Sequence, residues 1–394
     1  MARHYGMDWL RIGTFALLIF YHIGMVFVLW PYHVKAVTTV DWVKLPMLTT
    51  SPWRLTLLFL VSGYASRALL IRAPDLKRFV TTRTSRLLVP LAFGVVAIVP
   101  PQSWVELVTQ HGYARSLAYF WSHDFWRFGS VSGVTLPTWN HLWFVGYLWV
   151  YTLALALLLC VPRPARLQDG FDRLFGGMTV VWLPILYLLV FQVYGFKRWT
   201  DTHDVIGDGL AHLGFFPAFL FGFALAASPR TMAALVRWRW ISLVLAVLGY
   251  AIAAAVELRW SSTNPAPQWV ADQTLWARQV QCWGTIAALI GIAEASLNRD
   301  HPWRRTLAEA VFPFYLIHQT LIVVVAYWLR SLALPGVAQF AILTGTTVAG
   351  CWVFYLAGRR IAWLRPLIGL RRTLAPAPAS ATSQDIPRRS IGPS

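Results

Sequence analysis

The chain alternates between long apolar blocks and short polar gaps that are rich in arginine. An apolar block of about 20 residues is long enough for an α-helix to cross the hydrocarbon core of a bilayer. The pattern predicts ten such helices, at residues 10–31, 53–72, 87–102, 141–161, 178–195, 210–227, 240–258, 277–296, 310–329 and 337–357. We therefore expect an all-α, polytopic integral membrane protein with about ten transmembrane helices.

The first block is unusual because it keeps three ionisable residues, Asp8, Arg11 and His22. Ionisable groups are costly at membrane depth and usually serve a function there. At about 100° per residue, the spacing from Arg11 to His22 returns a helix to within about 20° of the same face. The two side chains then lie about 16 Å apart along that face, at about 1.5 Å per residue. Asp8 precedes Arg11 by three residues, which is within pairing reach.

The distribution of charge predicts the orientation of the helices. Arginines gather in alternate gaps and in the segment from Arg359 onward, and cytoplasmic loops are the ones that carry an excess of Lys and Arg. Both termini are therefore expected in the cytoplasm. The net charge of +18 follows from this topology, so it indicates membrane lipid, in particular anionic lipid, as a partner and gives no evidence for nucleic acid.

Composition divides the chain into one membrane domain and a short tail. Residues 1–372 hold all ten apolar blocks, whereas residues 373–394 are rich in Pro, Ala and Ser and are expected to form a disordered cytoplasmic tail. The three cysteines, Cys160, Cys282 and Cys351, stand singly. Their spacing fits neither a disulfide framework nor a metal site, so no metal is expected.

Five motifs in order along the chain resemble those of the membrane acyltransferase 3 family. They are Asp8-Trp9-Leu10-Arg11-x10-His22, Leu58-Phe59-Leu60-Val61-Ser62-Gly63-Tyr64, Phe79-x3-Arg83-x2-Arg86-Leu87-x2-Pro90, His141-Leu142-Trp143-Phe144-Val145 and Phe314-Tyr315-Leu316-Ile317-His318-Gln319. Each motif alone is short, but together they extend over residues 8–357. The order of the five motifs is what carries the resemblance.

The resemblance implies an activity. A family member of this type takes an acyl group from a cytoplasmic acyl-CoA and delivers it to an acceptor hydroxyl on the far side of the bacterial inner membrane. The opening segment and the stretch SPWRLTLLFLVSGYASR most resemble the branch that adds succinyl groups to osmoregulated periplasmic glucans. The resemblance thus implies acyl-CoA as donor substrate, a carbohydrate acceptor and no bound cofactor.

The residues of the first helix can be given roles in such chemistry. A neutral imidazole at mid-membrane can act as general base for a sugar hydroxyl, and His22 is the candidate for this role. Arg11 offers a bidentate fork for a phosphate or carboxylate of the donor, and Asp8 would orient it. The alternatives are a histidine that hydrogen-bonds a neighbouring helix and an arginine that anchors the topology.

The other motifs supply candidates for substrate binding. The family motif places Arg83 and Arg86, with Arg67 in the same loop, where they would hold the phosphates of CoA. His141 and Trp143 are expected at the outer mouth, where aromatic faces stack on sugar rings. His318 is expected to face the same cavity as His22. Packing and positive-inside anchoring are the alternative roles for all of these residues.

Other functions remain open at this level. One alternative is transfer of an acetyl or another acyl group to a different surface polysaccharide or to a small molecule. A glycan transporter would also place His and Arg along a path, but transporters usually show internal repeats or broken helices in corresponding halves. A scaffold without chemistry would not need the Asp8, Arg11 and His22 stripe. The residues do not distinguish direct transfer from an acyl-enzyme relay.

Overall fold

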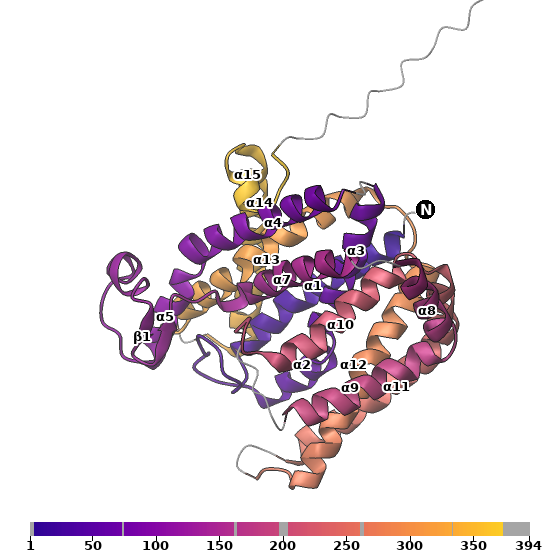
Figure 1. Cartoon of the computed structure of the whole chain (residues 1–394). Coiled ribbons are helices and arrows are strands. Elements are labelled where there is room, and N and C mark those ends of the chain that lie inside the picture. Colours follow the sequence, from indigo (N-terminus) through magenta and orange to yellow (C-terminus); the bar gives the residue numbers. More distant parts are fainter. Residues whose placement is uncertain are drawn as a thin grey trace, which may run out of the picture.

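Helices build almost the whole molecule, as Figure 1 shows for the computed structural model. The structure describes residues 4–72, 75–160, 164–196, 204–260, 264–332 and 334–372. The longer helices are α1 (Tyr5–Met25), α3 (Arg54–Arg72), α4 (Leu76–Phe93), α5 (Pro100–Gln110), α7 (Trp143–Leu159), α8 (Pro164–Phe175), α9 (Thr179–Phe196), α10 (Gly209–Leu225), α11 (Pro229–Arg259), α12 (Gln268–Ser296), α13 (Pro302–Leu329) and α14 (Gly336–Arg360). Short helices are α2 (Lys44–Thr50), α6 (Leu117–Tyr119) and α15 (Leu364–Leu367). The predicted tail, residues 373–394, lies outside the described residues.

Long apolar helices confirm an all-α membrane protein. Within the described ranges, six helical stretches are long and apolar enough to cross a bilayer, namely Asp41–Arg72, Leu76–Gln110, Asn140–Leu159, Pro229–Arg259, Pro302–Leu329 and Gly336–Arg360. A seventh is added if α8 and α9, which meet at a bend of 97°, count as one broken span. Each of the ten predicted blocks lies largely on helical backbone, although fewer than ten meet both criteria.

Several predicted boundaries differ from the structure, because α11, α12 and α13 begin at Pro229, Gln268 and Pro302, before the predicted starts. Two other differences have a local structural cause. The first helix ends at Met25 rather than at residue 31, because the chain turns back and the Lys35 ammonium donates to the carbonyl groups of Met25 and Val28, each at 2.8 Å. Burial lowers the pKa of Lys35 to about 8. The third block is longer than predicted, since α4 continues through a π-helical turn at Gly94–Ile98 into α5.

A small hairpin interrupts the all-α architecture. Strands β1 (Gly129–Val131) and β2 (Val134–Leu136) pair antiparallel. Ser132 and Gly133 join them with φ values of 49° and 91°. Positive φ at both central residues is the geometry of a type I′ turn, which matches the twist of a two-residue hairpin. The alternation in this loop is too short to be distinguished from a polar gap in the sequence.

Glycines allow α3 and α10 to pack closely. A Cβ added to Gly63 would lie 1.8 Å from the carbonyl oxygen of Phe219, and one added to Gly222 would lie 1.9 Å from that of Leu60. The two backbones therefore touch at this crossing, as small residues permit in membrane bundles. Gly63 and Gly222 therefore serve helix packing.

Several helix termini meet at one end of the bundle, which we call the basic end. The Asp8 carboxylate of α1 pairs with Arg304 of α13. His4 contacts Glu294 near the end of α12. Short helix α15 packs against α4 and α14 beside the same group (Figure 1). The polar ends of α1, α4, α12, α13 and α14 are therefore brought together around the first turns of α1.

Candidate active site

Three histidines from three helices form a buried cluster. His22 of α1 and His318 of α13 stack with ring centroids 5.1 Å apart, and His22 Nδ1 lies 2.8 Å from His318 Nε2. His141, just before α7, lies edge-on to His318 at 5.3 Å. His318 is completely buried. The expectation that His318 faces His22 agrees with this contact.

Hydrogen bonds fix the tautomers of the pair. His318 Nδ1 lies 2.7 Å from the Tyr315 carbonyl, which can only accept, so His318 carries its proton on Nδ1. Its Nε2 then accepts, and His22 must donate from Nδ1. The lone pair of neutral His22 is thus on Nε2, for which the described residues show no hydrogen bond. An imidazole with a free, correctly oriented lone pair is equipped to act as a general base.

Unpaired arginine nitrogens lie nearer the basic end. Arg11 donates from Nη2 to the Ala308 carbonyl at 2.9 Å, but its Nε is buried without a partner among the described residues. Arg83 has two such nitrogens, Nε and Nη2. It lies within electrostatic range of both Arg11 and Arg86. Buried donors are almost always hydrogen-bonded in folded proteins, so this cluster has the character of an anion site.

The ion pair of Asp8 has a different partner from the one we expected. Its Oδ2 lies 2.6 Å from Nη1 of Arg304, which also pairs with Asp300 at 2.7 Å. Arg304 is only 2% exposed. The structure thus places Asp8 in a bridge that ties α1 to α13 beside Arg11. This bridge could not be read from the local Asp8 and Arg11 spacing.

A polar cavity of about 350 Å³ lies beside Arg86. One wall is a face of α4 with three hydroxyl side chains, and the other is the segment after α15. The residues that line it are Thr81, Thr82, Ser85, Arg86, Pro366, Gly369, Leu370, Arg371 and Arg372. Buried Arg365 holds this segment by donating to the carbonyl groups of Arg371 (2.6 Å) and Arg359 (2.8 Å). Three arginines and no carboxylate therefore face this cavity.

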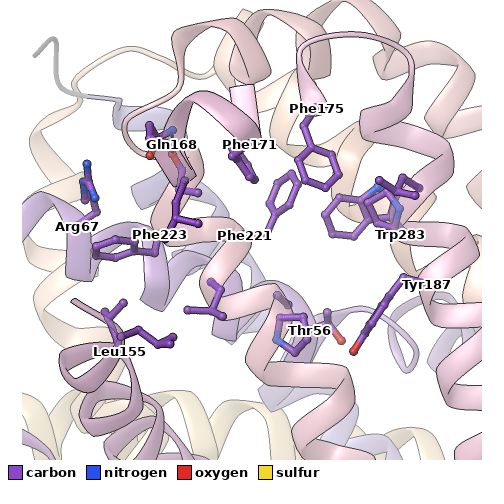
Figure 2. A pocket seen from close by; sticks show the side chains of 18 of the residues that line it. Thr56, Arg67, Leu155, Gln168, Phe171, Phe175, Tyr187, Phe221, Phe223 and Trp283 are labelled. Atoms are coloured by element: carbon purple, nitrogen blue, oxygen red, sulfur yellow. Dashed lines mark hydrogen bonds between the residues drawn. The ribbon is translucent and has the colours of Figure 1, made fainter. Parts of the chain in front are cut away.

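Arg67 lies elsewhere, on the rim of an apolar cavity of about 630 Å³. Its guanidinium is 4.8 Å from the centre of the Phe223 ring. Figure 2 shows Arg67 beside Phe223 on one side of this cavity and Trp283 on the other. None of the three clustered histidines lines it. The structure thus brings Arg83 and Arg86 together with Arg11 and does not bring Arg67 to them.

His141 and Trp143 lie deeper than an open outer mouth requires. They are 8% and 9% exposed. His141 Nε2 is 3.2 Å from the carbonyl groups of both Tyr315 and Leu316. The Trp143 ring packs edge-on against Tyr147. His141 is covered by α13, whereas Trp143 packs against Phe59, Tyr147 and Phe215. A place at the outer mouth stays a prediction for these two residues.

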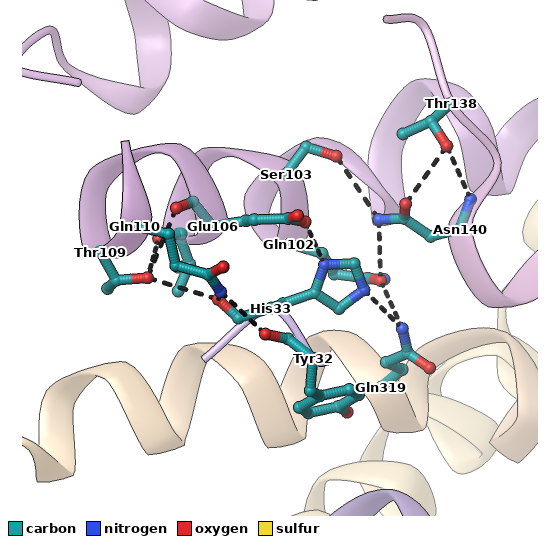
Figure 3. A network of polar contacts seen from close by, with 11 residues as sticks. Tyr32, His33, Gln102, Ser103, Glu106, Thr109, Gln110, Thr138, Asn140 and Gln319 are labelled. Carbon is teal, nitrogen blue, oxygen red and sulfur yellow. Dashed lines mark hydrogen bonds and ion pairs between the residues drawn. The ribbon is translucent and has the colours of Figure 1, made fainter. Parts of the chain in front are cut away.

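A polar network adjoins the histidines through α13. His33 Nδ1 lies 2.5 Å from Oε2 of Glu106, and Nε2 of Gln319 lies 3.0 Å from His33 Nε2. Gln319 also donates to Gln102 at 3.2 Å, and Asn140 donates to the same oxygen at 3.2 Å. Figure 3 shows His33 between Glu106 and Gln319. Sequence reasoning missed this network, although Gln319 directly follows His318.

The comparison with protein families identifies the family of this chain. The family described as acyltransferase domain, acyltransferase 3, matches residues 4–356. The chain belongs to this acyltransferase family. The resemblance indicated by the five motifs is thereby confirmed.

Several curated relatives carry a name that refers to glucans. Glucans biosynthesis protein C of Escherichia coli strain K12 is 25% identical over 201 residues, which are 50% of this chain and 49% of that protein. Proteins of the same name from E. coli strains 536 and ATCC 8739 match over the same length with the same identity. The match spans about half the length of these curated relatives. No solved structure matches the acyltransferase.

The acyltransferase has the groups for proton transfer and anion binding without a metal cluster. Among the described residues, no group of three or more His, Cys, Asp or Glu side chains is placed to hold a metal ion. His22 and Arg11 lie on α1, and Arg83 lies on α4. The histidine pair supplies a candidate base, and the unpaired guanidinium nitrogens of Arg11 and Arg83 supply a candidate anion site.

Proposed function

We propose that this acyltransferase moves a succinyl group from cytoplasmic succinyl-CoA to hydroxyl groups of an extracytoplasmic carbohydrate, such as osmoregulated periplasmic glucan. It would do so in the bacterial inner membrane with both termini in the cytoplasm. The observation that carries the proposal is the His22 and His318 pair, whose hydrogen bonds leave the His22 Nε2 lone pair free. The names of the relatives support the carbohydrate acceptor.

The donor would enter from the basic end. Concentration of arginine at this end fits a cytoplasmic face, since cytoplasmic loops retain Lys and Arg. The cavity beside Arg86, Arg371 and Arg372 suits the adenine nucleotide end of CoA, and its volume of about 350 Å³ lies in the range of small-molecule sites. Arg83 and Arg11 would bind further phosphate oxygens with their unpaired nitrogens.

The chemical step follows from the histidine pair. The acceptor hydroxyl donates its proton to His22 Nε2 while its oxygen attacks the thioester carbonyl. The carbon–sulfur bond then breaks, CoA leaves as the thiolate and takes up a proton, and the ester remains on the sugar. His318 orients the imidazole throughout because its Nε2 accepts from His22 Nδ1. Neither histidine needs a covalent intermediate in this scheme.

The acceptor would approach from the side of the polar network. Glu106, His33, Gln319, Gln102 and Asn140 supply donors and acceptors next to the histidine cluster. Sugar hydroxyls need such groups, because each buried hydroxyl requires hydrogen-bond partners. His141 and Trp143 would contribute to the same side, where the His141 ring lies against His318. The donor and acceptor thus reach His22 from opposite ends.

Analysis of periplasmic glucans tests the proposal directly. Glucans are purified from cells without the gene, with the intact gene and with the His22→Ala variant, and their acyl substituents are compared by mass spectrometry. Succinyl groups are expected only with the intact protein. Arg11→Ala is expected to weaken donor use mainly. Unchanged glucans in all three samples would contradict the acceptor, and normal product from a correctly inserted His22→Ala variant would contradict the site.

A further inference from the structure

Arg54 is a buried cation with no carboxylate partner among the residues that the structure describes. It begins α3 and is only 6% exposed. Its Nε and Nη1 atoms are buried and have no hydrogen-bond partner, and the ion pairs found across the described chain do not include it. A buried charge without a partner is strongly destabilising unless an anion compensates it. The fold therefore keeps this guanidinium for something other than an internal ion pair.

The position of Arg54 connects it with the reaction centre. Its guanidinium lies 3.4 Å from the centre of the Tyr21 ring. Tyr21 in turn packs edge-on against His22, with ring centroids 6.0 Å apart. His22 is within electrostatic range of Arg54. One aromatic ring thus separates the unpaired cation from the proposed general base.

Arg54 also lies on the correct side of His22. Helix α1 runs from Arg11, at the basic end, to His22 near its other end. Helix α3 contacts α1, and Arg54 is its first residue, at the end opposite Arg67 and Arg72. A donor whose phosphates occupy the basic end would therefore present its thioester to His22 and the far end of its acyl group toward Arg54.

We propose that Arg54 binds the carboxylate at the far end of a dicarboxylic acyl group and so selects succinyl over uncharged acyl groups. This inference rests on the proposed acyl transfer at His22. The carbonyl and carboxylate carbons of a succinyl group are joined by three bonds of about 1.5 Å and lie about 4 Å apart. That length spans one aromatic ring. A guanidinium with free Nε and Nη nitrogens matches the two oxygens of a carboxylate.

Two donors of equal length test the inference. Succinyl-CoA and butyryl-CoA have the same number of acyl carbons, and only the first ends in a carboxylate. For the wild-type protein in nanodiscs we expect kcat/KM to favour succinyl-CoA by about a hundredfold or more, because the neutral group leaves Arg54 unpaired. In Arg54→Gln this ratio should fall to below about threefold. Arg54→Lys should retain part of the preference, since it keeps the charge and loses the fork.

Controls separate this role from others. Arg330→Gln removes an exposed arginine at the end of α13 and should keep the wild-type ratio. Equal loss of transfer from both donors in Arg54→Gln would overturn the inference, as would a wild-type protein without preference. Equilibrium binding of the two donors without acceptor is measured in parallel. If the wild-type protein transfers neither group, the proposed function fails. In that case, a binding preference for succinyl-CoA that Arg54→Gln abolishes still supports the carboxylate site. Equal binding of the two donors by the wild-type protein overturns the inference.

Discussion

Replacement of His318 by leucine tests the orientation of the general base. In the structure His318 Nε2 accepts the His22 Nδ1 hydrogen at 2.8 Å in a buried position. Leucine has no acceptor, so the Nδ1 hydrogen of His22 loses its partner. A buried, unpaired donor costs about 1–3 kcal/mol. At 1.36 kcal/mol per factor of ten, kcat should fall by about 5- to 150-fold. In addition, the His22 proton can move from Nδ1 to Nε2, and His22 then has no lone pair on Nε2 to act as the base.

The assay measures release of the CoA thiol at saturating donor, with the full chain in nanodiscs. His318→Gln is the matched variant, because its side-chain oxygen can accept from His22 Nδ1, and it should keep more activity than His318→Leu. Unfolding temperatures of both variants show whether packing has changed. If His318→Leu keeps kcat within about twofold of wild type, or if both variants lose activity equally, the proposed tautomer does not matter for transfer.

Three further predictions concern the proposed donor site, the packing of α3 against α10 and the loop that contains Tyr113. Arg83→Gln should raise KM for acyl-CoA about tenfold with little change in kcat, because charged hydrogen bonds contribute about 1.5–3 kcal/mol. Initial rates at varied donor concentration measure this change. Gly63→Ala places a Cβ 1.8 Å from a carbonyl of α10 and should destabilise by about 1–3 kcal/mol in thermal unfolding, whereas Gly13→Ala, with open space around it, should not. Burial and a 2.6 Å hydrogen bond to Asp124 raise the pKa of Tyr113 to about 12. The stability that this hydrogen bond contributes is therefore lost as the pH rises through that value. In the Asp124→Asn variant, ultraviolet titration should show a lower pKa for Tyr113.

Apolar periodicity predicted most of the helices because membrane crossing demands it. Ten blocks of suitable length led to the all-α assignment, and the same helical period placed Arg11 and His22 on one face. The spacing of apolar residues does not predict where a side chain from a loop donates a hydrogen bond to a backbone carbonyl group at a helix end. Lys35 ends α1 early in this way, and the π-helical turn after Phe93 carries α4 into α5.

Partners far apart in sequence account for what could not be predicted in the site. His318 is 296 residues from His22, and Arg304 is 296 residues from Asp8. A motif gave His318 a position, but nothing in it specified which ring nitrogen would face His22. The His33 and Glu106 pair lies in a loop and a helix end without any motif. Its contact with Gln319 exists only because the turn after α1 folds back onto α13.

The charged groups inside the bundle divide into two kinds, and the division bears on function. Asp8 and Arg304 neutralise each other across two helices, so they stabilise the fold. Arg11, Arg83 and Arg54 instead keep buried nitrogens without hydrogen-bond partners in the described structure. Such nitrogens are costly unless a ligand anion reaches them. A donor with phosphates at one end and a carboxylate at the other would satisfy all three cations at once, and its thioester would then lie between them, beside His22.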